Sequence, residues 1–399
     1  MSKVKRYFTY FMCVIKIFLA FIYTQLHKKG LYAKDIWLIQ EKHTEARDNG
    51  YYLFKYIRTK HPEINAYYSI TYDSTDKYKV VTFGNIIEAD SITHYIYYLS
   101  AKNSIGSQRY GACPYPTDWV NRFRFLCRRD QKVIFLQHGI TINATPGLDY
   151  YKSRFDLFVC SAKPEFDYIH DKLHYPDSNV KMIGFCRYDG LNNSKPKKQI
   201  LIMPTFRKWL ASQNREMDAT NEESKLFKES RFYKEYTAVL TNQSLLSAAR
   251  NYGFVLVFYL HYALQSYTHL FEPYNNNFVR IADRYKYDVQ QLMVDSSIMV
   301  TDYSSVFFDF AYMRKPEVFF QFDEDEFRKK HYEQGYYDYR IDGFGPVFIE
   351  VNDVVDYLIH LMESDCKMEQ IYLDRVNTFF PFRDDCNCKR NYEAIRELG

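Results

Sequence analysis

Glycine and proline are scarce in this chain, and their scarcity argues against a disordered protein. Only 14 glycines and 12 prolines occur among 399 residues, and 47% of the residues are hydrophobic. Chains that stay disordered have the opposite composition, so folded domains with sizeable cores are expected. The length is sufficient for two domains of ordinary size.

Several familiar active-site and metal-binding motifs are missing. The sequence holds no G-x-x-x-x-G-K-[ST] loop, no G-x-G-x-x-G, no G-x-S-x-G and no H-E-x-x-H, so the simplest signatures of four enzyme classes are absent. We interpret the run Asp323-Glu324-Asp325 as a solvated acidic turn. The eight cysteines form no C-x-x-C pair, which indicates a reduced, cytosolic setting. No metal and no cofactor are expected.

Acidic residues are absent from the first thirty positions, where six of the 53 bases lie. Removing those six leaves 47 bases against 49 acids, so the body of the chain is nearly neutral. A nucleic-acid partner is not expected, because such partners are bound by a basic face.

A strongly apolar run near the N-terminus predicts a helix at a membrane surface. Lys16 interrupts residues 7–23, so the run falls short of the ~20 clean residues that a spanning helix needs. No small-residue cleavage site follows, so a signal peptide is not expected. Lys5, Thr9, Lys16 and His27 lie close to one stripe of a helical projection, which predicts an interfacial helix with its lysines towards anionic head groups. The alternatives are a buried helix that covers the first domain and a spanning helix.

The first half of the chain alternates short apolar runs with helical spacings. This alternation is typical of a parallel sheet with helices on both faces. A helix is expected around residues 52–57. Residues 110–129 break the pattern and could form an acceptor-side loop, a membrane-side loop or a plain connection. The apolar runs are residues 36–39, 66–70, 80–83, 94–99, 132–136, 157–160 and 180–183.

A polar stretch at residues 192–198 predicts a linker, because it has proline and no periodicity. The alternation restarts beyond it, with a long helix expected at about 226–251 and a charged loop at 207–223 beside the site. The later strands are expected at 200–203, 254–260, 278–282, 298–300 and 317–320. The predicted fold is α/β, with two Rossmann-like domains that face a cleft. The expected parts are a membrane-associating segment 1–30, an acceptor domain 31–192 and a donor domain 199–399 whose last helix could pack back on the first domain.

The stretch 298–320 reads as a strand, a polar turn, a helix and a second strand. The turn contains Asp302, Ser304 and Ser305 just before the helix. Free backbone N–H groups and hydroxyls at a helix start suit a phosphate or diphosphate. The simpler interpretation is that Asp302 or Ser304 merely caps the helix, and the sequence leaves both open.

Two histidines follow apolar strands in different halves of the chain. His138 precedes Gly139 after the run 132–136, and His261 follows the run 254–260. Ligands of open parallel sheets bind beyond the carboxyl ends of the strands, and Gly139 allows a close backbone approach. A neutral imidazole there could accept a proton from an attacking hydroxyl. A structural histidine remains the alternative at either position.

Two arginines also follow strands. Arg207, just after Thr205, is expected to pair with phosphate oxygens. Arg187 and Asp189 are weaker candidates that could form a salt bridge at the domain hinge.

The residues converge on a known family. Thr301-Asp302-Tyr303-Ser304-Ser305-Val306-Phe307-Phe308-Asp309-Phe310-Ala311, followed by Lys315-Pro316, resembles the signature of the CDP-glycerol glycerophosphotransferases of teichoic acid and capsule synthesis. Supporting matches are His138-Gly139, the segment 184–189, Pro204 to Arg207, His261, Gly345-Pro346 and the segment 384–391. The sequence departs from the family pattern at residues 140–143 and at Tyr262.

The resemblance implies a GT-B type fold and a peripheral enzyme at the cytoplasmic face of a bacterial membrane. Such an enzyme transfers glycerol phosphate or a related polyol phosphate from a CDP-polyol to a hydroxyl of a lipid-linked glycan or polyol-phosphate acceptor, releasing CMP. His138 matches the position of the proposed base. The other matched positions, associated with the donor phosphates and ribose, are His261, Thr205, Arg207, Asp302, Ser304 and Ser305. A GT-B nucleotide-sugar glycosyltransferase, a ribitol-phosphate transferase and a non-catalytic assembly protein are the rival hypotheses.

Overall fold

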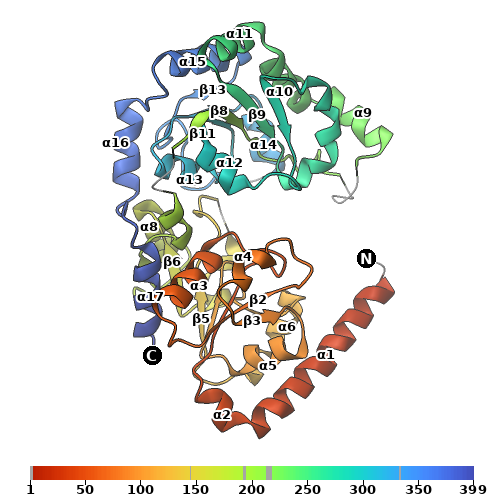
Figure 1. Cartoon of the computed structure of the whole chain (residues 1–399), viewed down its shortest axis with the longest axis vertical. Helices are drawn as coiled ribbons and strands as arrows, with labels where there is room; N and C mark the ends of the chain where they lie inside the picture. Colours follow the sequence, from red (N-terminus) through yellow and green to blue (C-terminus); the bar gives the residue numbers. More distant parts are fainter. Residues whose placement is uncertain (1–2, 144, 192–194, 213–217, 332–333) are drawn as a thin grey trace. The chain divides into compact units, whose positions relative to one another are not determined.

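The computed structural model describes residues 3–143, 145–191, 195–212, 218–331 and 334–399. The chain forms two compact units, each built on one parallel sheet (Figure 1). Unit 1 comprises residues 1–140, 145–190 and 381–399, and unit 2 comprises residues 141–144 and 191–380. The predicted α/β fold class with two parallel sheets is confirmed.

The sheet of unit 1 has seven parallel strands in the order β3-β2-β1-β4-β5-β6-β7. The strand order reverses between β1 and β4, and ligands of doubly wound folds bind beside such a reversal. The strands are β1 Trp37–Gln40, β2 Ala66–Ile70, β3 Ile86–Glu88, β4 Asn103–Gly106, β5 Lys132–Phe135, β6 Leu157–Cys160 and β7 Val180–Met182.

The sheet of unit 2 repeats this plan with six parallel strands in the order β10-β9-β8-β11-β12-β13. Its order reverses between β8 and β11. The strands are β8 Lys197–Ile202, β9 Val255–Tyr259, β10 Val279–Ala282, β11 Ser296–Thr301, β12 Glu317–Phe320 and β13 Val347–Phe348.

Helices connect the strands in both units. Those of unit 1 are α1 Lys3–Leu26, α2 Lys28–Tyr32, α3 Asn49–Lys60, α4 Lys77–Val81, α5 Ile92–Ser100, α6 Thr117–Val120, η1 Asn121–Leu126, η2 Pro146–Leu148, α7 Tyr150–Ser153, α8 Lys163–Lys172, η3 Cys186–Gly190 and α17 Asn387–Glu397. Those of unit 2 are α9 Asn221–Glu229, α10 Arg231–Thr241, α11 Gln243–Tyr252, η4 Tyr262–Leu270, η5 Glu272–Tyr274, α12 Val289–Asp295, α13 Phe307–Tyr312, α14 Glu324–Lys330, α15 Val351–Glu363 and α16 Gln370–Phe379.

Two apolar runs assigned to the sheet of unit 1 are helical instead. Residues 80–83 overlap the end of α4, and residues 94–99 lie inside α5. The strands that follow them are β3, only three residues long, and β4, whose sequence NSIG is half polar. Such short or polar segments give no strand pattern, because their pairing is set by the neighbouring strands.

The expected helix 226–251 consists of three helices. Ser230 and Asn242 each accept a hydrogen bond from a backbone N–H of the next helix, so each restarts the helix as an N-cap. Thr220 and Glu223 form a reciprocal capping box at the start of α9. The end of the expected charged loop 207–223 is therefore helical, and residues 213–217 of that loop lie outside the described part.

The last helix, α17, belongs to unit 1, where it packs against α3 and η3. The carboxylate of Asp189 accepts hydrogen bonds from the backbone N–H groups of Asn387 and Cys388, at 2.9 and 2.8 Å, and from the Asn387 side chain. Asp189 thus fixes the start of α17 on unit 1.

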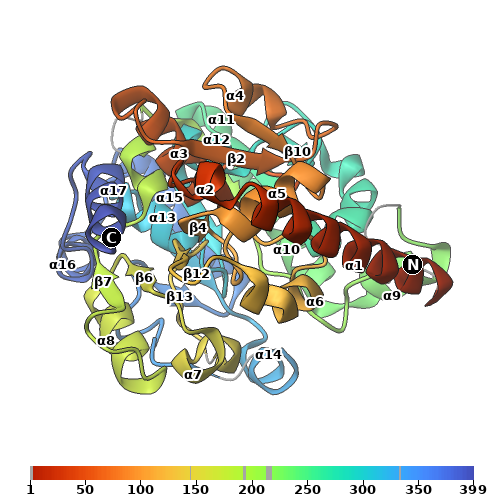
Figure 2. The same ribbon diagram turned by 90° about the horizontal axis from the view of Figure 1, so that it is seen from below.

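The N-terminal helix α1 packs along α5 (Figure 2). The side chains of Cys13, Ile17 and Ala20 are buried against unit 1. Lys16 donates a hydrogen bond to the Asp90 carbonyl at 2.7 Å, so its ammonium group points towards the protein. The expected orientation of Lys16 towards head groups is wrong, since the face that α1 exposes is apolar.

Candidate functional site

The strand-order reversal of unit 1 brings together the ends of β1, β4 and β5. Ser107, directly after β4, links these segments: its hydroxyl accepts a hydrogen bond from the Gly50 N–H at 3.1 Å, at the start of α3. Its carbonyl oxygen lies 3.3 Å from Nδ1 of His138. The sequence prediction that His138 lies at the carboxyl edge of the sheet agrees with this geometry.

The partner of His138 defines its tautomer. A carbonyl oxygen can only accept, so Nδ1 carries the proton in this hydrogen bond and Nε2 of the neutral ring keeps its lone pair. The His138 side chain is exposed. A neutral, accessible imidazole with a free Nε2 lone pair is the form that a general base requires.

Buried amides hold the backbone that carries His138. Asn49 donates hydrogen bonds to the carbonyls of Leu136 and Gln137, at 3.2 and 2.9 Å. Gln137 adopts a left-handed φ of 60°, and its side chain donates to the Val159 carbonyl and to Glu165. The amide hydrogen bonds stabilise this unusual turn, so the position of His138 is set by the core of unit 1.

Arg187 pairs with Asp48, at 2.9 Å, and its backbone N–H donates to Asn49. It is 7% exposed. Asp189 holds the start of α17, so the structure gives Asp189 a role besides the predicted salt bridge with Arg187. Both residues act within unit 1 as structural supports.

The N-terminus of α3 is already occupied by protein carboxylates. Glu41 accepts hydrogen bonds from the backbone N–H groups of Arg47, Asp48 and Tyr51. Burial, together with the Asp48 charge, raises the pKa of Glu41 to about 8, although the three N–H groups act in the opposite direction. This helix end therefore offers no open anion site.

The strand-order reversal of unit 2 carries the residues of the predicted donor site. The Asp302 carboxylate, directly after β11, accepts hydrogen bonds from the N–H groups of Thr205, at 2.8 Å, and Tyr303, at 2.6 Å. Thr301 donates from its hydroxyl to the Met203 carbonyl at 2.8 Å. These bonds tie the turn after β8 to the turn after β11.

Arg207 is the centre of this connection and is fully buried. Its guanidinium lies 2.9 Å from Asp302 and forms a two-pronged pair with Asp323, at 2.7 and 2.8 Å. It also donates to the Thr205 carbonyl. Burial opposes the charge, but the two carboxylates more than offset it and raise the pKa of Arg207.

The network changes the interpretation of three residues. Arg207 and Asp302 were expected to touch the donor, yet both are completely buried and engaged with each other. Asp323 was interpreted as part of a solvated turn, yet it is 8% exposed and holds Arg207. The structure assigns them to positioning the turn that follows β11.

The two serines of that turn are accessible. Ser305 is exposed, Ser304 is half-buried, and the Ser304 hydroxyl lies 3.5 Å from the Val306 N–H. The helix α13 begins only at Phe307 and has no side-chain cap. Neither Asp302 nor Ser304 therefore caps a helix in the ordinary way, and the two serines remain candidates for contact with a ligand.

His261 lies at the carboxyl end of β9, as expected. Its Nδ1 accepts a hydrogen bond from the Ala263 N–H at 3.2 Å, so the neutral ring carries its proton on Nε2 and can donate. The ring stacks on Phe206 with centroids 4.7 Å apart. His138 and His261 thus differ in tautomer: the first can accept a proton through Nε2, and the second can donate a hydrogen bond through Nε2.

Sequence reasoning missed His331. This ring packs edge-on against Phe206, at 4.5 Å, and accepts a hydrogen bond from the Lys208 N–H. Burial and the neighbouring Lys208 and Arg207 lower the pKa of His331 to about 4. It follows a charged helix and not a strand, so no pattern in the sequence marked it.

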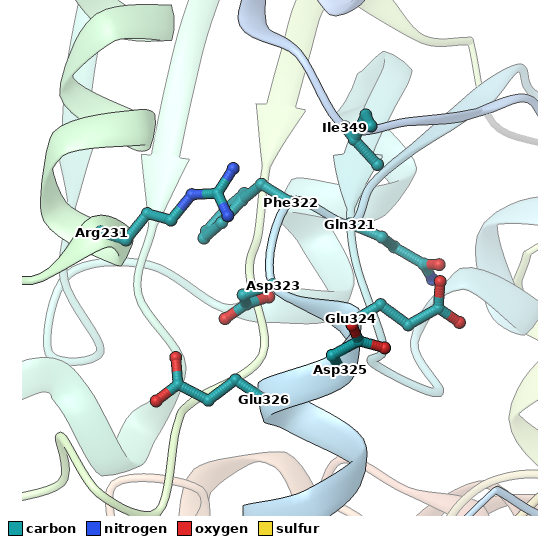
Figure 3. Close-up of a pocket in the computed structure, with 8 residues that line it drawn as sticks. All are labelled: Arg231, Gln321, Phe322, Asp323, Glu324, Asp325, Glu326 and Ile349. Carbon is teal, nitrogen blue, oxygen red and sulfur yellow. The ribbon is translucent and has the colours of Figure 1, made fainter.

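A cavity of about 390 Å³ lies at the start of α14 (Figure 3). Glu324, Asp325 and Glu326 line it, with Arg231 on the opposite side (Figure 3). The excess of carboxylates repels a diphosphate, so this cavity does not suit an anionic donor.

The matching family model describes CDP-glycerol:poly(glycerophosphate) glycerophosphotransferases and covers residues 20–397. This chain belongs to that family. The resemblance noted in the sequence is thereby confirmed.

Two curated relatives show where the similarity lies. The minor teichoic acid biosynthesis protein GgaB of Bacillus subtilis (strain 168) is 34% identical over 373 residues, which are 92% of this chain and 40% of GgaB. A teichoic acid poly(glycerol phosphate) polymerase of Staphylococcus epidermidis is 22% identical over 84% of this chain and 46% of its own length. The chain spans less than half the length of these relatives.

The solved structure of the wall teichoic acid polymerase TagF is similar over the whole of both chains, with a TM-score of 0.67 and 18% identity. The S. aureus MnaA–UDP structure matches 91% of this chain and 96% of its own, with a TM-score of 0.51 and 11% identity. These likenesses support the predicted α/β, GT-B-like fold.

Proposed function

We propose that this chain transfers glycerol phosphate from CDP-glycerol to a hydroxyl of a poly(glycerophosphate) acceptor in teichoic acid synthesis, with release of CMP. The family supplies the reaction class. One observation carries the assignment to particular atoms: the Ser107 carbonyl accepts from Nδ1 of the exposed residue His138, so Nε2 keeps its lone pair at the edge of a sheet where ligands bind.

In this reaction Nε2 of His138 accepts the proton of the acceptor hydroxyl. The hydroxyl oxygen forms a bond to the β-phosphorus, and the bond from that phosphorus to the oxygen bridging the two phosphates breaks. The electron pair leaves with CMP. Negative charge develops on the bridging and non-bridging oxygens, so hydrogen-bond donors directed at them lower the barrier.

In this proposal unit 2 supplies the hydrogen-bond donors that stabilise this charge. The hydrogen bond from the Ala263 N–H to Nδ1 places the proton of the neutral His261 ring on Nε2, and we assign that N–H and the hydroxyls of Ser304 and Ser305 to the donor phosphates. Arg207 and Asp302 contribute by fixing the turn that bears the serines. Capsule synthesis has the same chemical requirement and remains a second setting for the reaction.

We also propose that α1 places the enzyme at the cytoplasmic surface of the cell membrane, as a peripheral protein. Tyr7–Leu26 is long and apolar enough to cross a membrane, and 22% of its apolar 18-residue window is buried. One face packs on α5, so the helix can lie in the interface with its other face in the lipid. The large apolar side chains on the open face are Tyr7, Phe8, Phe11, Phe18, Leu19, Ile22, Tyr23 and Leu26.

Nucleotide release tests the reaction. The purified protein receives CDP-glycerol, CDP-ribitol or a UDP-sugar with a glycerol phosphate oligomer, and CMP and UDP are quantified. CMP from CDP-glycerol is expected. CMP from CDP-ribitol alone would move the chain to the ribitol-phosphate enzymes, which also match part of this chain, and UDP without CMP would indicate a glycosyltransferase.

A further inference from the structure

Arg109 is a cation that the proposed mechanism does not use. It lies two residues after Ser107 in the turn that follows β4. Two residues span at most roughly 7 Å, so the Arg109 backbone stays close to the carbonyl that holds His138. The long side chain of Arg109 therefore extends from the same edge of the sheet as the candidate base.

The turn that carries Arg109 is rigid. At one end, Ser107 binds the Gly50 N–H through its hydroxyl and His138 through its carbonyl. At the other end, Gly111, with φ of 60°, lies directly against Gly106: a Cβ on Gly106 would sit 2.6 Å from the Gly111 carbonyl oxygen. The backbone of Arg109 is thus held on both sides, which suits a group that must meet a ligand in a fixed place.

The guanidinium of Arg109 is not used in an ion pair. No carboxylate in the described part of the chain lies within 4.0 Å of it, whereas Arg187 is paired with Asp48. The Arg109 Nε–H is buried and has no hydrogen-bond partner among the residues that the structure describes. A buried donor without a partner costs free energy, and in native proteins such a donor often marks the place of an absent ligand or water.

The surroundings orient the guanidinium without neutralising it. It lies 5.0 Å from the centre of the Tyr110 ring. Its Nη1 comes within 3.4 Å of the place where a Cβ on Gly147 would stand, so it runs over the loop between β5 and α7. The same loop contains His138, which follows β5 by three residues. Arg109 therefore contacts the loop that carries the candidate base.

We propose that Arg109 binds the phosphate of the acceptor that is nearest to the attacking hydroxyl. A poly(glycerophosphate) acceptor ends in a glycerol unit, so its terminal hydroxyl is separated from an anionic phosphodiester by only three carbons and one oxygen. A planar guanidinium suits the oxygens of such a phosphate. This inference rests on the proposed function and gives unit 1 a specificity for charged acceptors.

Two acceptors separate this role from a structural one. The first is a short glycerol phosphate oligomer, and the second carries a methyl group on its last phosphate, which removes that negative charge. With Arg109→Gln, kcat/KM for the charged oligomer is expected to fall about 10- to 100-fold, the range for a lost charged hydrogen bond. For the methylated acceptor, kcat/KM should change less than about twofold, and the KM for CDP-glycerol should stay constant.

Matched variants complete the test. Arg154→Gln, which removes an exposed arginine of unit 1, should leave kcat/KM for both acceptors unchanged. Arg109→Lys should restore part of the loss. An equal loss with both acceptors, or no loss with either, would overturn the assignment.

A binding measurement separates this inference from the reaction. In a His138→Ala background, calorimetric titration with the charged oligomer should show weaker binding when Arg109→Gln is added. Equal binding in both proteins would refute the Arg109 site even if CMP release confirms the reaction. Weaker binding without CMP release by the wild type would keep the site and refute the reaction.

Discussion

The Arg207 network gives a prediction that distinguishes a structural residue from a ligand-binding one. Replacing Arg207 by Met keeps much of the side-chain length and removes the charge. Asp302 is completely buried and Asp323 is 8% exposed, so both carboxylates lose their cationic partner in the core of unit 2. Removing one partner of a buried ion pair typically costs about 3–5 kcal/mol, because a buried charge is left uncompensated.

The same loss can be expressed as a melting temperature. For a domain of 150–250 residues, each kcal/mol shifts Tm by about 2–4 °C, so Arg207→Met should lower the Tm of unit 2 by about 6–20 °C. The Tm of Arg207→Lys should lie between those of Arg207→Met and the wild type. An ammonium group keeps the charge but cannot form the two-pronged pair with Asp323.

Differential scanning calorimetry measures this effect, with urea unfolding as a second observable. Arg231→Gln is the matched control, because Arg231 lies in the same unit in an exposed pair with Glu235. Surface pairs contribute about 0–1 kcal/mol, so the control should melt within a few degrees of the wild type. A Tm for Arg207→Met equal to the control, together with a raised KM for CDP-glycerol, would refute the structural assignment and restore direct donor contact.

Two further predictions concern unit 1. Burial lowers the pKa of His94 to about 4, although the Asp90 charge and the hydrogen bond with the Ala112 carbonyl, at 3.0 Å, act in the opposite direction. The unfolded chain therefore takes up a proton first as the pH falls. Stability of the order of 3 kcal/mol should therefore be lost between pH 6.5 and 4; His94→Gln should flatten this dependence in urea titrations, and an unchanged slope would contradict it. In vesicle sedimentation with anionic lipid, Phe11→Ser with Phe18→Ser should weaken binding at least tenfold, since each buried Phe contributes roughly 1.5–3 kcal/mol. Lys16→Gln should bind vesicles like the wild type. If Lys16→Gln weakened vesicle binding and the double Phe variant did not, α1 would present its other face to the membrane.

The sequence was sufficient for the architecture because buried parallel strands leave a strong pattern. The runs at 66–70 and 132–136 are β2 and β5 almost residue for residue. The pattern failed where tertiary contacts decide the structure. The strand β4 contains Asn103 and Ser104, both buried, and is held by pairing with β1 and β5 on either side.

The sequence predicted where in the fold the candidate site residues lie, but not which groups their side chains contact. A residue that follows a strand is placed at the correct edge of the sheet, and His138, His261 and Arg207 all lie there. Whether such a residue meets solvent depends on partners far away in sequence. Asp323 is 116 residues from Arg207 and removes its guanidinium from the surface, which no local pattern reveals.

The face that α1 presents could not be read from the sequence either. A helical projection shows that Lys16 lies on a different side from Phe18, but it does not say which side meets the protein. The Asp90 carbonyl accepts from the Lys16 ammonium and settles the matter. A lysine inside an apolar run can thus satisfy a backbone carbonyl instead of facing head groups.

His138 carries the central claim, and the most direct test is transfer by His138→Asn. Asparagine is smaller and can still donate a hydrogen bond, but it cannot accept a proton at neutral pH. With CDP-glycerol and a glycerol phosphate oligomer, we expect CMP release to fall by about 10²- to 10⁴-fold, the usual contribution of a general base. The affinity for CDP-glycerol, measured by calorimetry, should be unchanged. Transfer at the wild-type rate by this variant would contradict the assignment of His138 as the base.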